Sequence, residues 1–175
     1  MKRRLLSTIL IAVMCLTMSP LPVKAEEVTI TDAEDNGISL LADPEMGGAI
    51  ASANSWSNIQ ALINNATDSE TYMITLTDNI TNSGSDSTLT VPAGKDIVID
   101  LNGHYIDAKE VKTVIDVSGK LTIKNSDSQN YMNAAIMNGK TDASDSAGGI
   151  VVEDGGEVIM SGGHIRDCEA TSVRN

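Results

Sequence analysis

The chain has 175 residues, enough for one domain, and 24 acidic residues against 12 basic ones give a formal net charge of −12. This charge repels nucleic-acid phosphates and anionic lipid headgroups, so nucleic acid is excluded as a partner. With no Phe, one Trp and three Tyr, the apolar content is mainly aliphatic, which suits thin stacked strands better than a core built on aromatic side chains.

Residues 1–25 have the pattern of a secretory signal. A positive segment at residues 2–4 precedes an apolar stretch, Leu5–Met18, which is too short to span a bilayer comfortably, and cleavage is predicted after Ala25. An uncleaved membrane anchor is the alternative. Cleavage removes four basic residues and no acid, so 8 basic and 24 acidic residues leave a charge of −16. We therefore expect a secreted chain with no membrane span after cleavage.

The next segment is predicted to be a leader followed by one short helix. Residues 26–54 are acidic and rich in small residues, which predicts a flexible leader with a short strand at residues 28–31. The run Ser57-Asn58-Ile59-Gln60 fits a capping box. Apolar residues at helical spacing follow it, so we predict a helix over residues 57–65.

From about residue 72 the pattern is that of short strands separated by Gly and Asn turns. We predict strands at Tyr72–Leu76, Leu89–Val91, Ile97–Leu101, Val114–Val117, Leu121–Ile123, Ala135–Met137, Gly149–Val152, Glu157–Met160 and His164–Ile165. A strand–Gly turn–strand unit recurs, with Gly94 and Gly119 separated by 25 positions and Gly119 and Gly156 by 37. We interpret the longer interval as two coils of about 18 to 19 residues, because self-similarity at roughly 20 residues is typical of a solenoid.

These features predict an all-β fold, a right-handed parallel β-helix over residues 55–175. Stacked coils bury their inward Ile, Val and Leu in one column, and each coil supplies backbone hydrogen bonds to the next. The helix at residues 57–65 is expected to cap the first coil, with a partner-binding helix as the alternative. The β-helix itself is expected to be incomplete at its C-terminus. An antiparallel β-sandwich is the competing fold.

The strand and turn motifs resemble a known group of proteins. The segments "DIVIDLNGHYID", "VSGKLTI" and "GGIVVEDGGEVIMSGGHI" are similar to the N-terminal part of bacterial secreted and cell-surface β-helix proteins with a pectate-lyase-like fold. The resemblance covers about residues 55–168 and rests on turn and core residues, so it implies the fold more than the function. Members of this group are usually long, with further repeat modules and a cell-wall anchor, so we expect this chain to be a truncated product or a fragment.

Extracellular β-helices often cleave or bind acidic polysaccharides, so carboxylate clusters were considered as catalytic candidates. The best set comprises Asp96, Asp100, Asp107 and Asp116. Asp100 and Asp116 lie on neighbouring predicted coils, and with His104 they are the alternative catalytic residues. The favoured interpretation is structural: Asp100 caps a turn, and His104 and the similarly placed His164 are outward or corner residues. We therefore expect no catalytic site.

Metal and sugar binding have only limited support in the sequence. Loop acids that could converge on Ca²⁺ are Asp142, Asp145, Glu153 and Asp154. The favoured interpretation of these residues is a solvated acidic surface, so no cofactor is expected. Three tyrosines offer few platforms for sugar stacking. After signal cleavage Cys168 is the only cysteine, which excludes an intramolecular disulfide.

The sequence thus predicts an exported structural or adhesion-type module at the cell surface, by analogy at the level of the fold. Its expected partners are extracellular glycans or host and cell-surface proteins, together with end-to-end self-association through an open last coil. A fragment of an extracellular carbohydrate-active enzyme, a polysaccharide lyase or hydrolase, is the alternative function. A remnant that folds poorly alone is a third possibility, because an uncapped coil leaves an exposed edge.

Overall fold

The computed structural model describes residues 40–43, 48–143 and 146–171. The predicted signal segment (residues 1–25) and the strand expected at residues 28–31 lie outside the described residues. Within the described part, no helix is both long enough and apolar enough to cross a membrane.

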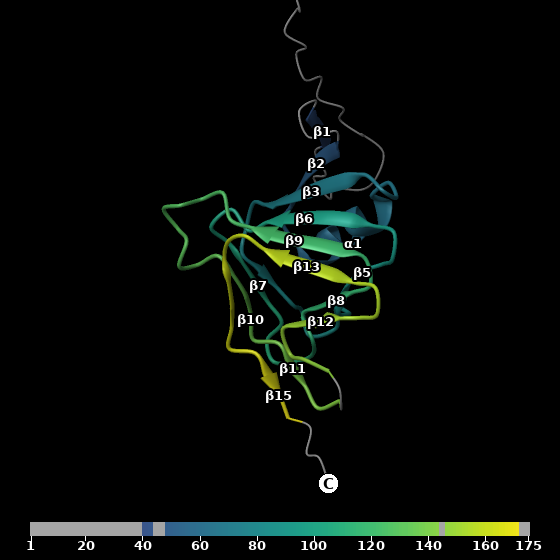
Figure 1. Ribbon diagram of the computed structural model, residues 1–175. Helices are drawn as coiled ribbons and strands as arrows, with labels where there is room; N and C mark the ends of the chain where they lie inside the picture. Colours follow the sequence, from purple (N-terminus) through teal and green to yellow (C-terminus); the bar gives the residue numbers. More distant parts are fainter. Residues whose placement is uncertain (1–39, 44–47, 144–145, 172–175) are drawn as a thin grey trace, which may run out of the picture.

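Short strands wind into a parallel β-solenoid of about five turns (Figure 1). Sheet A contains β1 (Leu40–Asp43), β2 (Gly48–Ala53), β3 (Thr71–Leu76), β6 (Asp96–Asp100), β9 (Lys120–Lys124) and β13 (Glu157–Met160). Sheet B contains β4 (Ile80–Thr81), β7 (Tyr105–Asp107), β10 (Ala135–Met137) and β14 (His164–Arg166). Sheet C contains β5 (Leu89–Val91), β8 (Ile115–Val117) and β12 (Ile150–Val152), and sheet D pairs β11 (Lys140–Thr141) with β15 (Glu169–Ala170).

Every strand pair in these sheets is parallel except β1 with β2. The predicted parallel solenoid is therefore confirmed, and the antiparallel sandwich is wrong. Parallel pairing arises because each strand is too short to form a stable hairpin but can add to the strand of the preceding coil.

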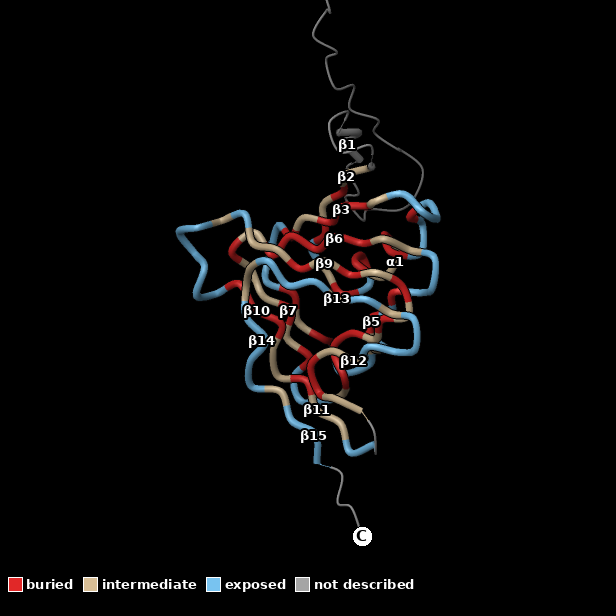
Figure 2. Tube along the Cα trace, in the orientation of Figure 1, coloured by how far each residue is buried: buried red, intermediate tan, exposed pale blue. Residues whose placement is uncertain are grey.

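The core is a column of aliphatic side chains that repeat in register from coil to coil. In sheet A the register places Ile74 beside Ile99 and Ile99 beside Ile123, and all three are fully buried. Figure 2 shows the buried positions along the inner side of the coils. Burying one such side chain contributes about 1.5–3 kcal/mol, so stacking coils is strongly favoured.

The coil that runs from β9 to β13 is longer than the sequence predicts. Glu157 of β13 pairs directly with Lys120 of β9, so the 37 positions between them form one coil, and the prediction of two shorter coils is wrong. Residues 126–134 form a loop that projects from the body between β9 and β10 (Figure 1). The separation in sequence between β11, which ends at Thr141, and β12, which begins at Ile150, also lengthens this coil. Glycine spacing alone cannot distinguish such outward loops from a complete extra coil.

The ordered body begins within the segment predicted as a flexible leader. Strand β2 pairs with β3, with Ile50 in register with Met73. Ala51 and Ala53 of β2 are buried. Small side chains occupy the inner face at this end of the solenoid, so the segment lacks the large apolar residues that identify a strand in a sequence.

Helix α1 spans Trp56–Asn65, and its N-cap lies two residues before the cap that the predicted capping box implies. Ser55 is the N-cap, and its hydroxyl accepts a hydrogen bond from the Asn58 amide at 3.3 Å. The predicted cap at Ser57 is therefore wrong. Gln60 does not return to the helix start, because its amide group bonds elsewhere.

Gln60 joins the helix to the first strand of sheet C. Its Oε1 accepts from the Thr90 amide at 2.8 Å, and its Nε2 donates to the Thr90 carbonyl at 3.1 Å. The apolar face of α1, which includes Ile59 and Ile63, is fully buried. Helix α1 thus covers the free edge of β5, which is the capping role predicted for it.

Candidate functional site

The structure places the three candidate catalytic residues on different walls of the solenoid. Asp100 lies in β6 of sheet A, Asp116 in β8 of sheet C, and His104 in the turn before β7 of sheet B. Glycoside hydrolysis requires two carboxyl groups on either side of one bond. These residues therefore do not form such a pair.

Asp100 links two turns of neighbouring coils. Its Oδ1 accepts from the amides of Asn102 at 3.0 Å and Ser126 at 2.9 Å. Its Oδ2 lies 3.3 Å from Lys124 Nζ, and the residue is only 3% exposed. All these contacts satisfy backbone or charge within the fold, so the structural interpretation of Asp100 is supported.

His104 is a corner residue. Its amide donates to the Leu101 carbonyl at 2.7 Å, which closes the tight turn. Its Nδ1 lies 3.2 Å from Asn79 Oδ1 in the preceding coil. His164 is the exposed first residue of β14 in sheet B, so it is an outward residue of a strand and not a corner residue.

The two remaining carboxylates of the set also serve the fold. Asp96 Oδ2 accepts from Thr71 Oγ1 at 3.2 Å and lies 3.3 Å from Lys120 Nζ, so it continues a polar ladder across three strands. Asp107 Oδ1 accepts from the Lys109 amide at 2.8 Å and from Asn138 Nδ2 at 3.0 Å.

The predicted calcium ligands are separated along the chain and in the fold. Asp142 follows β11, Glu153 and Asp154 form the turn after β12, and Asp145 lies outside the described residues. Among these residues, Glu153 lies near Asp116. Burial is the larger cause, and the negative charge of Glu153 the smaller one, that raises the pKa of Asp116 above its ordinary value. Across residues 40–43, 48–143 and 146–171, no group of three or more His, Cys, Asp or Glu side chains gathers around a point that could hold a metal ion.

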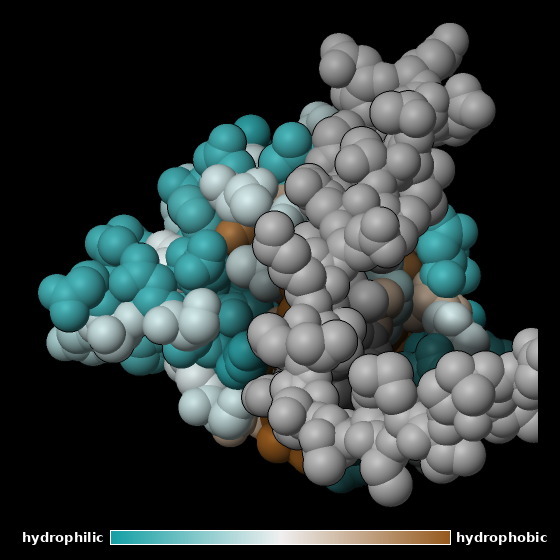
Figure 3. Space-filling view, turned by 90° about the horizontal axis from the view of Figure 1, so that it is seen from above, coloured by the Kyte–Doolittle hydropathy of each residue, from teal (hydrophilic) through white to brown (hydrophobic). Residues whose placement is uncertain are grey.

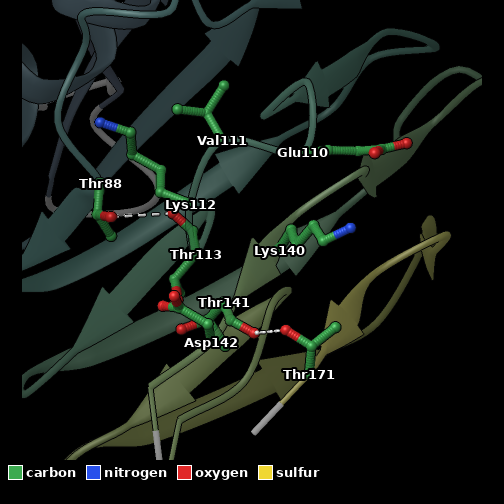
Figure 4. A pocket seen from close by; sticks show the side chains of 9 residues that line it. All are labelled: Thr88, Glu110, Val111, Lys112, Thr113, Lys140, Thr141, Asp142 and Thr171. Atoms are coloured by element: carbon green, nitrogen blue, oxygen red, sulfur yellow. Dashed lines mark hydrogen bonds between the residues drawn. The ribbon is translucent and has the colours of Figure 1, made fainter.

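A hollow that the sequence did not predict lies beside sheet D. This threonine groove has a volume of about 540 Å³. Its lining residues are Thr88, Glu110, Val111, Lys112, Thr113, Lys140, Thr141, Asp142 and Thr171 (Figure 4). A Lys-Thr dipeptide occurs at 112–113 and again at 140–141, and the two stack because the Lys140 amide donates to the Lys112 carbonyl at 3.0 Å. That repeated dipeptide is the sequence signal that could have identified the groove.

Three of the groove threonines, Thr88, Thr113 and Thr171, connect adjacent coils through their hydroxyls. Thr88 Oγ1 donates to the Thr113 carbonyl at 3.0 Å, and Thr171 Oγ1 donates to the Thr141 carbonyl at 3.2 Å (Figure 4). Thr113 Oγ1 donates in turn to a carbonyl of the next coil at 2.8 Å. Because the hydroxyl protons of Thr88, Thr113 and Thr171 are used within the fold, these three hydroxyls offer lone pairs, and not protons, to a ligand.

The charged groups of the groove have mixed signs. Lys140 Nζ lies 3.1 Å from Glu169 Oε2, and this hydrogen bond raises the pKa of Lys140. Lys112 supplies a second ammonium, and Glu110 and Asp142 supply carboxylates. The groove can therefore exchange hydrogen bonds with a hydroxyl-rich molecule. Its lining contains no Ser, Cys or His that could serve as a nucleophile or as an imidazole base.

Comparison with protein-family models, with curated proteins and with solved structures returned no match.

Proposed function

We propose that this chain is an exported structural or adhesion-type module of the cell surface, related to bacterial secreted β-helix proteins with a pectate-lyase-like fold. The observation that carries the proposal is the placement of Asp100, Asp116 and His104 on three different walls. A module that binds through its outer faces needs regular ladders of side chains and no convergent catalytic group.

A water-facing module also needs a polar outer surface. In the view from above, the described surface is largely hydrophilic, with apolar areas small and scattered (Figure 3). The net charge of −12 keeps such a surface soluble and disfavours acidic polysaccharides as ligands.

The ligand that the threonine groove suits is a neutral, hydroxyl-rich glycan. Sugar hydroxyls can donate to the threonine oxygens and to Glu110 and Asp142, and they can accept from Lys112. Aromatic side chains do not line the groove, so hydrogen bonding and not stacking would hold the sugar.

A carbohydrate-active enzyme fragment is the second candidate. It is favoured by one observation, that Glu110 and Asp142 both line the threonine groove. Two carboxylates in one groove are a minimum requirement for glycoside hydrolysis.

One experiment separates the two functions. The full chain is incubated with neutral and acidic polysaccharides, with and without Ca²⁺, and both protein binding and the release of new chain ends are measured. We expect binding to a neutral glycan without cleavage. The variants Asp142→Asn and Lys112→Gln should weaken binding about tenfold, whereas Asp154→Asn, an exposed carboxylate outside the groove, should not. Release of chain ends that Asp142→Asn abolishes would establish the enzyme instead.

Export is tested separately. Expression of the complete chain in a bacterial host, followed by N-terminal sequencing of the protein outside the cytoplasm, should give a product that begins at Glu26. A product that retains Met1 in the membrane fraction would support the uncleaved anchor.

A further inference from the structure

The coil formed by residues 150–171, here called the terminal coil, has inward side chains that remain exposed. Val152, Met160 and Ile165 are 51%, 40% and 45% exposed. Their register partners one coil earlier, Val117, Ile123 and Ile136, are fully buried. Among the described strands none pairs with the outer edge of β12, β13 or β14. The terminal coil therefore presents an open strand edge beside an apolar surface.

The backbone of β13 is prepared to accept another parallel strand. The amides of Glu157 and Ser161 donate to carbonyls of the β9 side, at 2.8 Å in both cases. Backbone groups alternate in direction along a parallel strand. The N–H and C=O groups of Val158 and Met160 therefore point away from β9 and toward the open edge.

Charge shows what kind of strand fits this edge. On the outer face of sheet A the register runs from Asp96 to Lys120 to Glu157, with 3.3 Å between Lys120 Nζ and Asp96 Oδ2. On sheet D, Lys140 pairs with Glu169 at 3.1 Å. In both ladders the residue at the open edge is a glutamate that pairs with a lysine of the neighbouring strand. The next position in each ladder therefore favours a basic residue.

The same charges disfavour a second copy of this chain. The terminal coil carries five carboxylates, Glu153, Asp154, Glu157, Asp167 and Glu169, against one basic residue, Arg166. Strands pair about 4.8 Å apart, which is well within the Debye length of about 8 Å, so two such edges repel each other. The opposite end of the solenoid offers no matching parallel edge for head-to-tail stacking, because its outermost described strand, β1, is antiparallel to β2, and α1 covers β5.

We propose that the open edge of β13 binds, in parallel, an extended polypeptide segment that carries a lysine or arginine in register with Glu157 and apolar residues in register with Val158 and Met160. The chain contains a segment of this kind: β9, with the sequence KLTIK, pairs with the other edge of β13 in the same register. This partner is a protein segment, so the inference stands or falls independently of glycan binding by the threonine groove.

The test uses the full chain and two labelled peptides. The first peptide has the sequence of residues 118–126, SGKLTIKNS, and the second is identical except that both lysines are glutamates. Fluorescence anisotropy should show that the lysine peptide binds roughly five- to tenfold more tightly, the change expected when cross-strand pairs turn from attractive to repulsive. High salt should reduce this preference.

Two variants locate the site. Glu157→Lys should reverse the preference, so that the glutamate peptide binds more tightly. Met160→Pro removes one edge donor from a strand that tolerates proline at its free side, and it should abolish binding of both peptides while the far-UV circular dichroism stays unchanged. The proposal is overturned if wild type binds neither peptide or both equally, or if sedimentation shows a dimer that excludes the lysine peptide.

Discussion

The structural role of Asp100 can be tested directly by its removal. Its carboxylate accepts two backbone hydrogen bonds, from Asn102 and Ser126, and pairs with Lys124, although it is only 3% exposed. A hydrogen bond to a charged group contributes about 1.5–3 kcal/mol, so Asp100→Ala should lower the free energy of unfolding by about 3–4 kcal/mol. Asp100→Asn keeps one oxygen acceptor but loses the charge, and it should cost about 1–2 kcal/mol.

The assay is urea unfolding followed by the fluorescence of Trp56, the single tryptophan, which is buried against the core. Asp154→Ala is the matched control, since this aspartate is exposed in a turn, and its effect should stay within about 0.5 kcal/mol. If Asp100→Ala unfolds at the same urea concentration as Asp154→Ala, the structural role assigned to Asp100 is wrong.

Three further predictions concern the turns, pH and the helix cap. Gly119→Ala should prevent stable stacking of the coils, because a Cβ at this position would lie 2.3 Å from a carbonyl oxygen of the preceding coil. Gly155 has φ +84° and open space around it, so Gly155→Ala should lower the free energy of unfolding by only about 1 kcal/mol. Thermal melts of the two variants check this difference. Burial raises the pKa of Asp116 above its ordinary 3.8, so ionisation of this carboxyl group opposes folding as the pH rises. Asp116→Asn should therefore have a higher melting temperature than wild type at neutral pH. A difference in melting temperature that persisted well below pH 3.8 would contradict this reasoning. Ser55→Ala should lose about 1 kcal/mol in urea unfolding and Ser57→Ala almost nothing, and the opposite order would restore the capping box predicted from the sequence.

Much of the fold could be predicted because its signal is local and periodic. The alternation in Ile97–Leu101 and Leu121–Ile123, with a Gly turn between them, identifies strands whose inner faces must be buried. The 37 positions that follow Gly119 predict two coils but form one, because an inserted loop and an extra coil lengthen the sequence equally. The strand at Gly48–Ala53 was missed, since its inward alanines give little hydrophobic signal.

The candidate site could be predicted less well, because it depends on which coils are neighbours. Asp100 and Asp116, expected on neighbouring coils, lie on the same coil and belong to different sheets, since β6, β7 and β8 follow one another within one turn. Lys112 and Lys140 are distant in sequence, yet they meet through one backbone hydrogen bond at 3.0 Å.

The amino-acid sequence by itself determined the solenoid class, the aliphatic core and the capping helix, because turn chemistry and alternating hydrophobicity act within a few residues. Only the tertiary structure decided the coil register, and with it the threonine groove, the charge ladders and the open edge of β13. Those features depend on hydrogen bonds between strands about 25 to 37 residues apart, and no local preference specifies such a distance.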